Sequence, residues 1–366
     1  MLFFQCIKYK RKIIVILNLR KFYKMKRQVL VTGGTGYIGS HTVVELQAAG
    51  LDVVIIDDLS NSSAEVVDNI EKISGIRPAF EQFNLLDSVM LKSFFEKYPK
   101  IEAIIHFAAF KAVGESVEKP LAYYRNNLVS LMNILECMTE FKVPNLVFSS
   151  SCTVYGQPDQ LPVTESTPKK DAESPYGNTK AISEEVLHDV VKVTPELNVI
   201  ALRYFNPIGA HPSSLIGELP RGVPNNLVPF ITQTAAGIRQ QLSVFGNDYN
   251  TPDGSCIRDY INVVDLAKAH VIAIERLLNS VNTDRFEFFN IGTGNGASVL
   301  GVVNTFEQAT GVKLNYKIVD RRAGDIEKIY ADTTKANTVL GWQATTSLYD
   351  TLISAWNWEK KIRNIG

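Results

Sequence analysis

The stretch QVLVTGGTGYIG, residues 28–39, decides the fold. Its first five residues are mainly apolar and β-branched, as expected for a strand that is buried on both faces of a parallel sheet. Three glycines follow in the spacing G-x-x-G-x-x-G. Residues 38–49 then continue with helical periodicity up to Gly50, which is placed to end a helix. The pattern predicts a strand, a tight turn and a helix.

Each glycine of the turn has its own physical task. Gly33 permits the tight turn, Gly36 lets the backbone approach a pyrophosphate, and Gly39 lets the helix pack closely on the strand. The phosphates would then lie at the positive end of the helix dipole. Asp57 follows Gly39 by 18 residues, at the end of the second predicted strand. A carboxylate there can accept hydrogen bonds from the adenosine ribose, so the stretch predicts a dinucleotide site.

The acids Asp57 and Asp58 also indicate which dinucleotide binds. No basic residue stands beside them in the sequence. Two carboxylates would repel a 2′-phosphate, so NAD is favoured over NADP. An acidic pair of this kind also fits a loop that merely caps a strand end.

Strand and helix patterns alternate from the glycine turn onward. The predicted strands are residues 28–32, 53–56, 103–107, 145–149 and 199–204, and the helical stretches between them include 38–49, 121–140 and 180–193. Such alternation predicts an α/β fold, a doubly wound parallel sheet of Rossmann type with helices on both faces. We therefore predict a dinucleotide-binding domain over residues 25–206.

The composition of the sequence changes after about Asn206. Five prolines crowd a glycine-rich segment that cannot be long regular structure: Pro207, Pro212, Pro220, Pro224 and Pro229. Short predicted elements follow, such as the helix 266–278 and the strand 286–291. We predict a smaller α/β C-terminal substrate lobe over residues 207–366, with some segments returning to the sheet.

The charge balance hides two unlike parts. The 366 residues hold 38 Lys+Arg and 38 Asp+Glu. Residues 1–24 contain seven bases and no acid, so the remainder holds 31 bases and 38 acids, a net charge of −7. The basic segment fits a targeting peptide or a membrane-surface arm, or an extension outside the fold. We predict the last, because residues 13–17 form only a short apolar stretch and Met25 directly precedes the first strand.

Composition also bounds the partners and the compartment. A net charge of zero gives no reason to expect a nucleic-acid partner, and no apolar run reaches the roughly 18 residues that span a membrane. Cys6, Cys137, Cys152 and Cys256 are scattered without C-x-x-C spacing. This scatter argues against a metal site and a disulfide framework, and it favours a reducing cytoplasm.

A candidate catalytic pair stands at Tyr176 and Lys180. The segment YGNTK places the two side chains at i and i+4, on one face of a helix. Such a pair alone would also fit a solvated surface. Here, however, it follows the serines 149–151, which end a predicted strand at the edge where open α/β sheets bind ligands.

With these residues the chain resembles the extended, sugar-nucleotide-modifying branch of the short-chain dehydrogenase/reductase superfamily, and within it the UDP-glucose 4-epimerase family. The resemblance covers essentially Lys26 to the C-terminus. It rests on blocks that occur in order: VTGGTGYIGSH, HFAAFKAVGES, SSSCTVYG, YGNTK, RYFNPIGAHP, PNNLVPF, VFGNDY with TPDG, RDYINVVDLA and RRAGD.

The resemblance implies an epimerisation at C4 of UDP-galactose and UDP-glucose, through a transient 4-keto sugar, with NAD held as a prosthetic group. Tyr176 would be the general base, although a free tyrosine has a pKa of about 10. Lys180 and the positive nicotinamide ring must lower that pKa by about 3, which corresponds to about 4 kcal/mol. Ser151 would bind the 4-oxygen and orient its proton, and Thr153 would assist.

The resemblance also implies two sets of binding residues, and a homodimer packed through helices that flank the sheet. NAD would be bound by Gly33, Gly36, Tyr37, Ile38, Gly39, Asp57, Asp58, Asn61, Ser62, Asn84, Leu85, Phe107, Ala108, Lys111, Asn126, Tyr176, Lys180 and Tyr204. The UDP-sugar would be bound by Ser151, Tyr176, Phe205, Asn206, Asn226, Leu227, Phe245, Arg258, Arg322, Asp325 and Ile329. Arginine suits a diphosphate because its planar fork binds two oxygens at once, although Arg258 and Arg322 alone would also fit surface ion pairs.

Three positions depart from the family pattern. Asn84-Leu85 stands where Asp-Ile is common beside the adenine, and Asn84 can still accept a hydrogen bond through its side-chain carbonyl. Cys152 replaces a common alanine and is predicted to pack rather than react. Ile329 stands where either tyrosine or a smaller residue governs the room at the sugar C2, so acceptance of N-acetylated UDP-sugars stays open.

Two other functions compete with this one. A related dehydratase or decarboxylase would need a carboxylate beside the serine and threonine, and Ser151-Cys152-Thr153 lacks one. A catalytically silent NAD-binding regulator would be expected to have lost Ser151, Tyr176 or Lys180. The sequence therefore favours a UDP-sugar 4-epimerase, with UDP-N-acetylglucosamine or another UDP-sugar as the alternative substrate.

Overall fold

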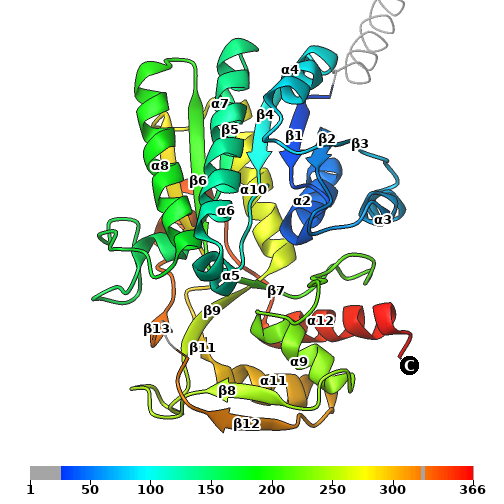
Figure 1. Cartoon of the computed structure of the whole chain (residues 1–366), viewed down its shortest axis with the longest axis vertical. Helices are drawn as coiled ribbons and strands as arrows, with labels where there is room; N and C mark the ends of the chain where they lie inside the picture. Colours follow the sequence, from blue (N-terminus) through cyan, green and yellow to red (C-terminus); the bar gives the residue numbers. More distant parts are fainter. Residues whose placement is uncertain (1–25, 323–325, 366) are drawn as a thin grey trace, which may run out of the picture.

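Seven parallel strands form the central sheet of the protein (Figure 1). The structure, a computed structural model, describes residues 26–322 and 326–365. The basic segment 1–24 and Asp325 lie outside the described residues. The strands run in the order β10-β6-β5-β4-β1-β2-β3. Their bounds are β1 Gln28–Thr32, β2 Asp52–Asp57, β3 Ala79–Gln82, β4 Ile101–His106, β5 Asn145–Ser151, β6 Asn198–Tyr204 and β10 Phe286–Ile291.

The predicted fold class is confirmed. Strands β1 and β10 have the predicted bounds, and β2, β4, β5 and β6 differ from the prediction by at most two residues at an end. The order of the strands along the chain reverses between β1 and β4. A crevice opens at the carboxyl ends of the strands at such a reversal, and ligands of doubly wound sheets bind there. The edge strand β3 was not predicted, because its residues are only partly buried and lack a long apolar run.

Helices cover both faces of the sheet, as predicted. One face packs against α2 Tyr37–Ala48, α3 Glu65–Ser74, α10 Val263–Leu278 and the π-helix η3 Ala336–Leu340. The other packs against α4 Ser88–Lys97, α7 Ser130–Glu140 and α8 Pro175–Val193. The short helices α5 Val113–Glu118 and α6 Pro120–Tyr124 lie beside α8. None of the helices in the described part of the chain is long and apolar enough to cross a membrane.

The predicted helical stretch over 121–140 is helical in the structure, but it is not one regular α-helix. A π-helix, η1 Arg125–Val129, separates α6 from α7. Asn127 in this π-helix is buried and bonds both the backbone of Phe110 and the hydroxyl of Thr179 on α8. Hydrophobic periodicity does not reveal a π-helical turn, which contains more residues than an α-helical turn. The polar contacts of Asn127 accompany this turn, and the apolar pattern does not report them.

Helix α8 begins five residues before its predicted start at Lys180. Ser174 caps it by accepting a hydrogen bond from the Gly177 N–H at 3.2 Å, and Pro175 fills the first helical position. Proline suits that position because its missing N–H would have no partner there. Tyr176 therefore lies in the first turn of α8, one turn before Lys180.

The second lobe is built mainly from the C-terminal part of the chain, below the sheet in Figure 1. Strand β9 pairs with β7, β11 and β13, and β8 pairs with β12. The strands are β7 Asn206–Ile208, β8 Leu242–Phe245, β9 Ile257–Asn262, β11 Gly296–Ser298, β12 Tyr316–Val319 and β13 Lys328–Ile329. The helices are α9 Leu227–Ala235, α11 Val299–Thr310 and α12 Leu348–Arg363. Between these elements, β10 pairs with β6 in the large sheet, and α10 packs against that sheet.

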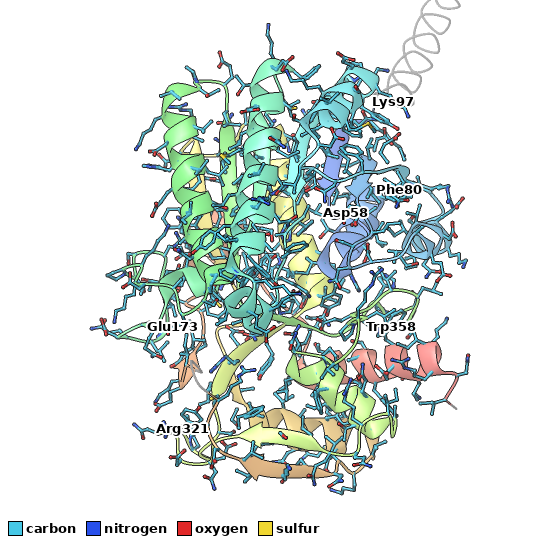
Figure 2. All side chains as sticks on the ribbon, in the orientation of Figure 1. Asp58, Phe80, Lys97, Glu173, Arg321 and Trp358 are labelled. Atoms are coloured by element: carbon cyan, nitrogen blue, oxygen red, sulfur yellow. The ribbon has the colours of Figure 1, made fainter. Side chains whose placement is uncertain are left out.

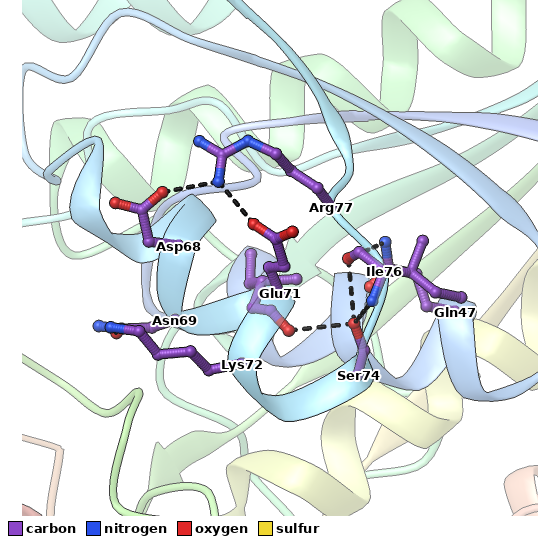
Figure 3. Close-up of polar contacts among 9 residues, drawn as sticks. Gln47, Asp68, Asn69, Glu71, Lys72, Ser74, Ile76 and Arg77 are labelled. Carbon is purple, nitrogen blue, oxygen red and sulfur yellow. Dashed lines mark hydrogen bonds and ion pairs between the residues drawn. The ribbon is translucent and has the colours of Figure 1, made fainter.

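The end of α3 is fixed by polar contacts that Figure 3 draws. Arg77 pairs with Asp68 and Glu71 on α3, each at 2.7 Å. Gln47 on α2 donates to the carbonyl of Ile76 at 3.1 Å. The three charged side chains are about half exposed, so these ion pairs contribute little to stability, whereas the Gln47 bond ties α3 to α2.

A buried ion pair joins α8 to β6. Arg203 donates two hydrogen bonds to the two carboxylate oxygens of Glu184, at 2.8 and 2.6 Å, and both side chains are almost fully buried. Ser150 on β5 and Lys169 each add a contact to that carboxylate at 2.6 Å. Burial acts to raise the pKa of Glu184, but Arg203 and then Lys169 bring it below its usual range. The carboxylate therefore stays ionised and fixes α8 against β5 and β6.

We predict that Glu184→Ala lowers the free energy of unfolding by about 3–5 kcal/mol, because it leaves the guanidinium of Arg203 buried without its partner. Urea unfolding at neutral pH measures this loss. The contribution of Glu184 is present above the carboxyl pKa of the unfolded chain and is lost as the pH falls through the lowered pKa of the folded state. The exposed neighbour Glu185→Ala is the matched control, and equal effects of the two variants would contradict the assignment.

Candidate active site

The glycine turn leaves a backbone cradle at the start of α2. Gly33 has a φ of +70°, and a Cβ atom there would lie 2.8 Å from the backbone nitrogen of Ala108. A Cβ atom on Gly39 would lie 2.2 Å from the carbonyl oxygen of Gly33. Gly36 occupies the N-cap position and has no side chain to accept from the first N–H groups of α2. Those groups, with the residues Tyr37 and Ile38 that carry them, are placed to bind an anion.

The acid predicted to bind ribose organises the loop that follows β2. Asp57 accepts hydrogen bonds from the Thr35 N–H at 3.2 Å, the Leu59 N–H at 2.9 Å and the Ser62 hydroxyl at 3.1 Å. Ser62 also bonds the hydroxyl of Thr35 at 2.7 Å. The loop after β2 is therefore tied directly to the glycine turn, and Asn61 lies exposed on it.

Asp58, labelled in Figure 2, faces the neighbouring loop after β3. It accepts from the side-chain amide of Asn84 at 2.8 Å. The side-chain oxygen of Asn84 accepts from the Leu86 N–H, so one of its lone pairs is already used. Leu85 points into the core between sheet and helices, and its carbonyl accepts from Asn133 on α7.

The segment after β4 faces the glycine turn from the other side of the crevice. The Phe107 N–H donates to the Thr32 carbonyl at 3.0 Å, and Ala108 meets Gly33 as described above. The ammonium of Lys111 lies 5.6 Å from the centre of the Tyr37 ring. Asn126 in η1 donates to Asn127 at 3.0 Å, which places it behind this segment. The crevice thus has one wall after β2 and another after β4, as a dinucleotide requires.

The catalytic candidates meet at the carboxyl end of β5. The side chains of Tyr176 and Ser151 lie close together, and Ser151 acts to lower the pKa of Tyr176. Lys180, only 4 % exposed, donates to the backbone carbonyl of Ser149 at 2.6 Å and lies 4.8 Å from the centre of the Phe148 ring. The side chain of Ser149 bonds the hydroxyl of Tyr204. The structure therefore brings the predicted serine, tyrosine and lysine together, with Tyr204 beside them.

Burial governs the ionisation of this group. It lowers the pKa of Lys180 to about 7, while the charge of Glu184 opposes this effect. Burial also raises the pKa of Tyr176 well above its usual value, the neighbouring Tyr204 adds to that rise, and Ser151 opposes it. The chain alone therefore does not make Tyr176 acidic, because a phenolate in this dry site lacks compensating charge. An activated base there needs additional positive charge close to it.

Thr153 follows in a 3-10 turn, η2 Cys152–Tyr155, that Ser151 caps by accepting from the Thr153 N–H at 3.2 Å. Among the described residues, the buried hydroxyl oxygen of Thr153 has no hydrogen-bond partner. It faces Gly177 in the first turn of α8, where a Cβ atom would lie 3.4 Å away. A ligand at this site could supply the partner that the hydroxyl lacks.

Predicted substrate residues from both lobes meet near the end of β5. Phe205, Cys152 and Ile329 belong to one buried apolar cluster. Arg258 on β9 stands in register with Ile329 on β13, and its charge acts on Cys152. Burial raises the pKa of the Cys152 thiol to about 12, which fits the predicted packing role.

The other predicted substrate residues lie further along the second lobe. Arg322 lies over the ring of Phe245 at the end of β8, with 5.6 Å to the ring centre. Asn206 begins β7, and Asn226 directly precedes Leu227, the first residue of α9. These residues of the second lobe make up the rest of the series of predicted substrate contacts.

The sequence did not indicate four residues of the site region. They are Asn127, Glu184, Glu218 and Arg221. Glu184 could have been noticed, because it continues the i, i+4 series of Tyr176 and Lys180 by one more turn. The partners of Glu218 and Arg221 lie far away in the sequence, so no local pattern reveals them.

The fold and the site together define a dinucleotide-dependent member of the extended short-chain dehydrogenase/reductase superfamily. Residues 30–354 match the family described as GDP-mannose 4,6 dehydratase. The UDP-glucose 4-epimerase of Bacillus subtilis is 50 % identical over 90 % of this chain and 96 % of its own length. The chain belongs to the UDP-glucose 4-epimerase family.

Two solved structures show the same likeness in three dimensions. A UDP-glucose 4-epimerase from Stenotrophomonas maltophila, with bound NAD and formylated UDP-arabinopyranose, is 45 % identical with a TM-score of 0.89 over 93 % of this chain and 100 % of its own. The enzyme from Bifidobacterium longum, in complex with NAD+ and UDP, is 43 % identical with a TM-score of 0.88 over the same shares. These neighbours hold the kinds of ligand that the crevice and the series of residues beyond it suit.

We predict that the buried amine of Lys180 makes the stability of the nucleotide-free chain depend on pH between about 7 and 10. In this window the unfolded chain holds a proton that the folded chain lacks, since the folded pKa is about 7 and the unfolded one is ordinary. The contribution of Lys180 to the free energy of unfolding therefore rises with pH. Lys180→Met should remove this rise in thermal unfolding measured at several pH values.

The control for this experiment is Lys192→Met, at an exposed position of the same helix. Its unfolding curve should follow that of the unchanged chain at every pH. Parallel pH profiles for the Lys180→Met chain and the unchanged chain would show that Lys180 is not the group that titrates.

Proposed function

We propose that the protein interconverts UDP-galactose and UDP-glucose by reversible epimerisation at the sugar C4, through a transient 4-keto sugar, as a step of galactose metabolism. The observation that carries the proposal is the meeting of Ser151, Tyr176 and Lys180 beside the glycine turn. When bound, NAD accepts the C4 hydride and returns it to the opposite face of the sugar, without net oxidation.

The roles of the chain's own residues follow from their chemistry. Tyr176 takes the proton of the 4-hydroxyl as general base and gives it back when the hydride returns. Ser151, which lies close to Tyr176, orients that proton, and the free hydroxyl of Thr153 assists. Lys180 supplies positive charge near the phenolate, because Ser149 holds its amine on the same helix face as Tyr176. Its lowered pKa lets that charge respond to the other charges in the site.

The UDP part of the substrate is assigned to the second lobe. Arg258 and Arg322 suit the diphosphate, since each guanidinium can bind two phosphate oxygens. Phe245 and Arg322 lie close together at the outer end of the series, where a uracil ring could pack. Asn206, Asn226 and Leu227 line the path between, and Asp325, although outside the described residues, suits a ribose hydroxyl.

The division into lobes at about residue 206, the assembly and the compartment are also proposed. Apolar side chains on α5 and α6 are exposed, with Val117 at 61 % and Leu121 at 79 %, and they support a homodimer through helices beside the sheet. The described cysteines, Cys137, Cys152 and Cys256, are free buried thiols, which supports a cytoplasmic enzyme.

The alternative substrates are UDP-N-acetylglucosamine and other UDP-sugars, and Ile329 is the observation that keeps them open. This side chain is 3 % exposed and packs with Cys152 and Phe205, so it belongs to the wall of the sugar site. A larger side chain would narrow the site and a smaller one would widen it. The choice of substrate therefore depends on how much room Ile329 leaves at C2.

We predict that Tyr176→Phe reduces the rate of epimerisation by about 10²–10⁴-fold, because the variant keeps the ring but loses the group that moves the proton. The measurement follows anomeric NMR signals of UDP-galactose and UDP-glucose with purified protein and no added NAD. Tyr349→Phe, at an exposed position of α12, is the control. Failure of the unchanged chain to interconvert the two sugars would contradict the proposed function, and full activity of Tyr176→Phe would remove Tyr176 as the base.

We also predict that Ile329→Ala raises the rate for UDP-N-acetylglucosamine relative to UDP-glucose, and that Ile329→Tyr lowers it. The physical reason is the volume that each side chain leaves beside the sugar. Rates for both substrate pairs, measured side by side for the three proteins, give the ratio. Ratios that stay unchanged across the series would show that Ile329 does not limit the room at C2.

A further inference from the structure

A segment of the second lobe crosses back to the dinucleotide domain. Residues 210–226, which we call the strap, connect β7 to α9. Figure 1 shows the strap as a green loop that extends below α2 and α3 and above α12. It begins as a tight hairpin, in which Ala210 bridges Gly217 and the His211 N–H donates to the Ile216 carbonyl at 3.1 Å.

Arg221 joins the strap to the loop that follows β2. Its guanidinium donates to three backbone carbonyls of that loop: Ser60 at 2.7 Å, Leu59 at 3.1 Å and Ser62 at 2.6 Å. Contacts to three carbonyls within four residues fix the course of the loop more firmly than any one of them would. These bonds use three of the five N–H donors of the guanidinium, from both of its terminal nitrogens.

The loop that Arg221 holds is the one that Asp57 organises. Asp57 accepts from Leu59 and Ser62 on the inner side, while Arg221 donates to the same two residues from the outer side. Ser62 also reaches Thr35 of the glycine turn. The loop is therefore held between the glycine turn and the strap, at the edge where the adenosine ribose of a dinucleotide is expected.

Glu218, three residues before Arg221, also anchors the middle of the strap. Its carboxylate accepts from Lys111 at 3.3 Å and from Asn226 at 2.7 Å, and its carbonyl accepts from Trp358 of α12 at 3.0 Å. Trp358, labelled in Figure 2, also packs against Gly217, where a Cβ atom would lie 2.5 Å from the indole ring. The strap thus spans both walls of the crevice, after β4 at Lys111 and after β2 at Arg221.

We propose that Arg221 is a positioning residue that keeps the loop after β2 closed against the glycine turn and thereby slows the release of NAD. The inference rests on the proposed function, since an epimerase must keep its reduced cofactor until the hydride returns. Release between the two hydride transfers would strand the 4-keto sugar. A clamp on the adenosine side holds the dinucleotide without touching the reacting atoms, so it acts on retention and not on the chemical step.

The experiment compares NAD release from purified enzyme by exchange against isotope-labelled NAD, followed by mass spectrometry of the bound nucleotide. Arg221→Gln and Arg221→Lys should both release NAD about tenfold faster, because neither reproduces the three-carbonyl contact. With saturating NAD, their kcat and their KM for UDP-galactose should stay unchanged, and so should the melting temperature of the loaded protein. Arg77→Gln is the control, since it removes an exposed arginine from the nearby end of α3.

Each possible result either supports or contradicts the proposed role of Arg221. Release from both Arg221 variants at the rate of the unchanged chain and of Arg77→Gln would overturn the role of Arg221. Extraction of NADP from the unchanged chain would also overturn it, because Arg221 would then serve a 2′-phosphate. If the purified enzyme is active and carries NAD, but substitution of Arg221 does not change the release of NAD, only this inference is refuted. Purified protein that neither carries nor binds NAD would refute the proposed function and the inference together.

Discussion

The buried amine of Lys180 is the constraint on which the rest of the site depends. A lysine that is 4 % exposed is costly unless its protons have acceptors and its charge has a purpose. One acceptor is the backbone carbonyl of Ser149, which ties the amine to the last residues of β5. This contact forms only if α8 keeps its position along the direction of strand β5. The ion pair between Glu184, one turn further along α8, and Arg203 on β6 fixes that position.

Three consecutive serines distribute these tasks along the end of β5. The Ser149 carbonyl accepts from Lys180 and the Ser149 hydroxyl bonds Tyr204. Ser150 donates to Glu184, and Ser151 lies close to Tyr176. One strand end therefore sets the positions of the base, the cation and the buried ion pair at once. The price of this arrangement is a dry site, in which the pKa of the Tyr176 phenol is raised. The base consequently becomes effective only when additional positive charge is bound beside it.

Sequence reasoning worked where the chemistry was local. The glycine turn, the acid after β2 and the Tyr176–Lys180 pair are each set by a short spacing. In the structure the Thr35 N–H joins the glycine turn to Asp57, and Tyr176 and Lys180 lie one turn apart on α8. Sequence reasoning failed where the local structure depends on a residue that is distant in the sequence. The π-helix over Arg125–Val129 depends on Asn127 bonding Phe110 and Thr179, and β3 depends on pairing with β2. No basic residue stands beside Asp57 in the sequence, but in the folded chain Arg221 contacts the loop that follows Asp57.

The central claim is that hydride leaves C4 and returns to it within one site, while Tyr176 moves only the hydroxyl proton. The most direct test uses UDP-galactose that carries deuterium at C4, incubated with the purified enzyme in ordinary water. The account predicts that the UDP-glucose formed keeps the deuterium at C4, as read by NMR and mass spectrometry. Loss of the label to water would show that C4 is deprotonated instead, and would contradict the account.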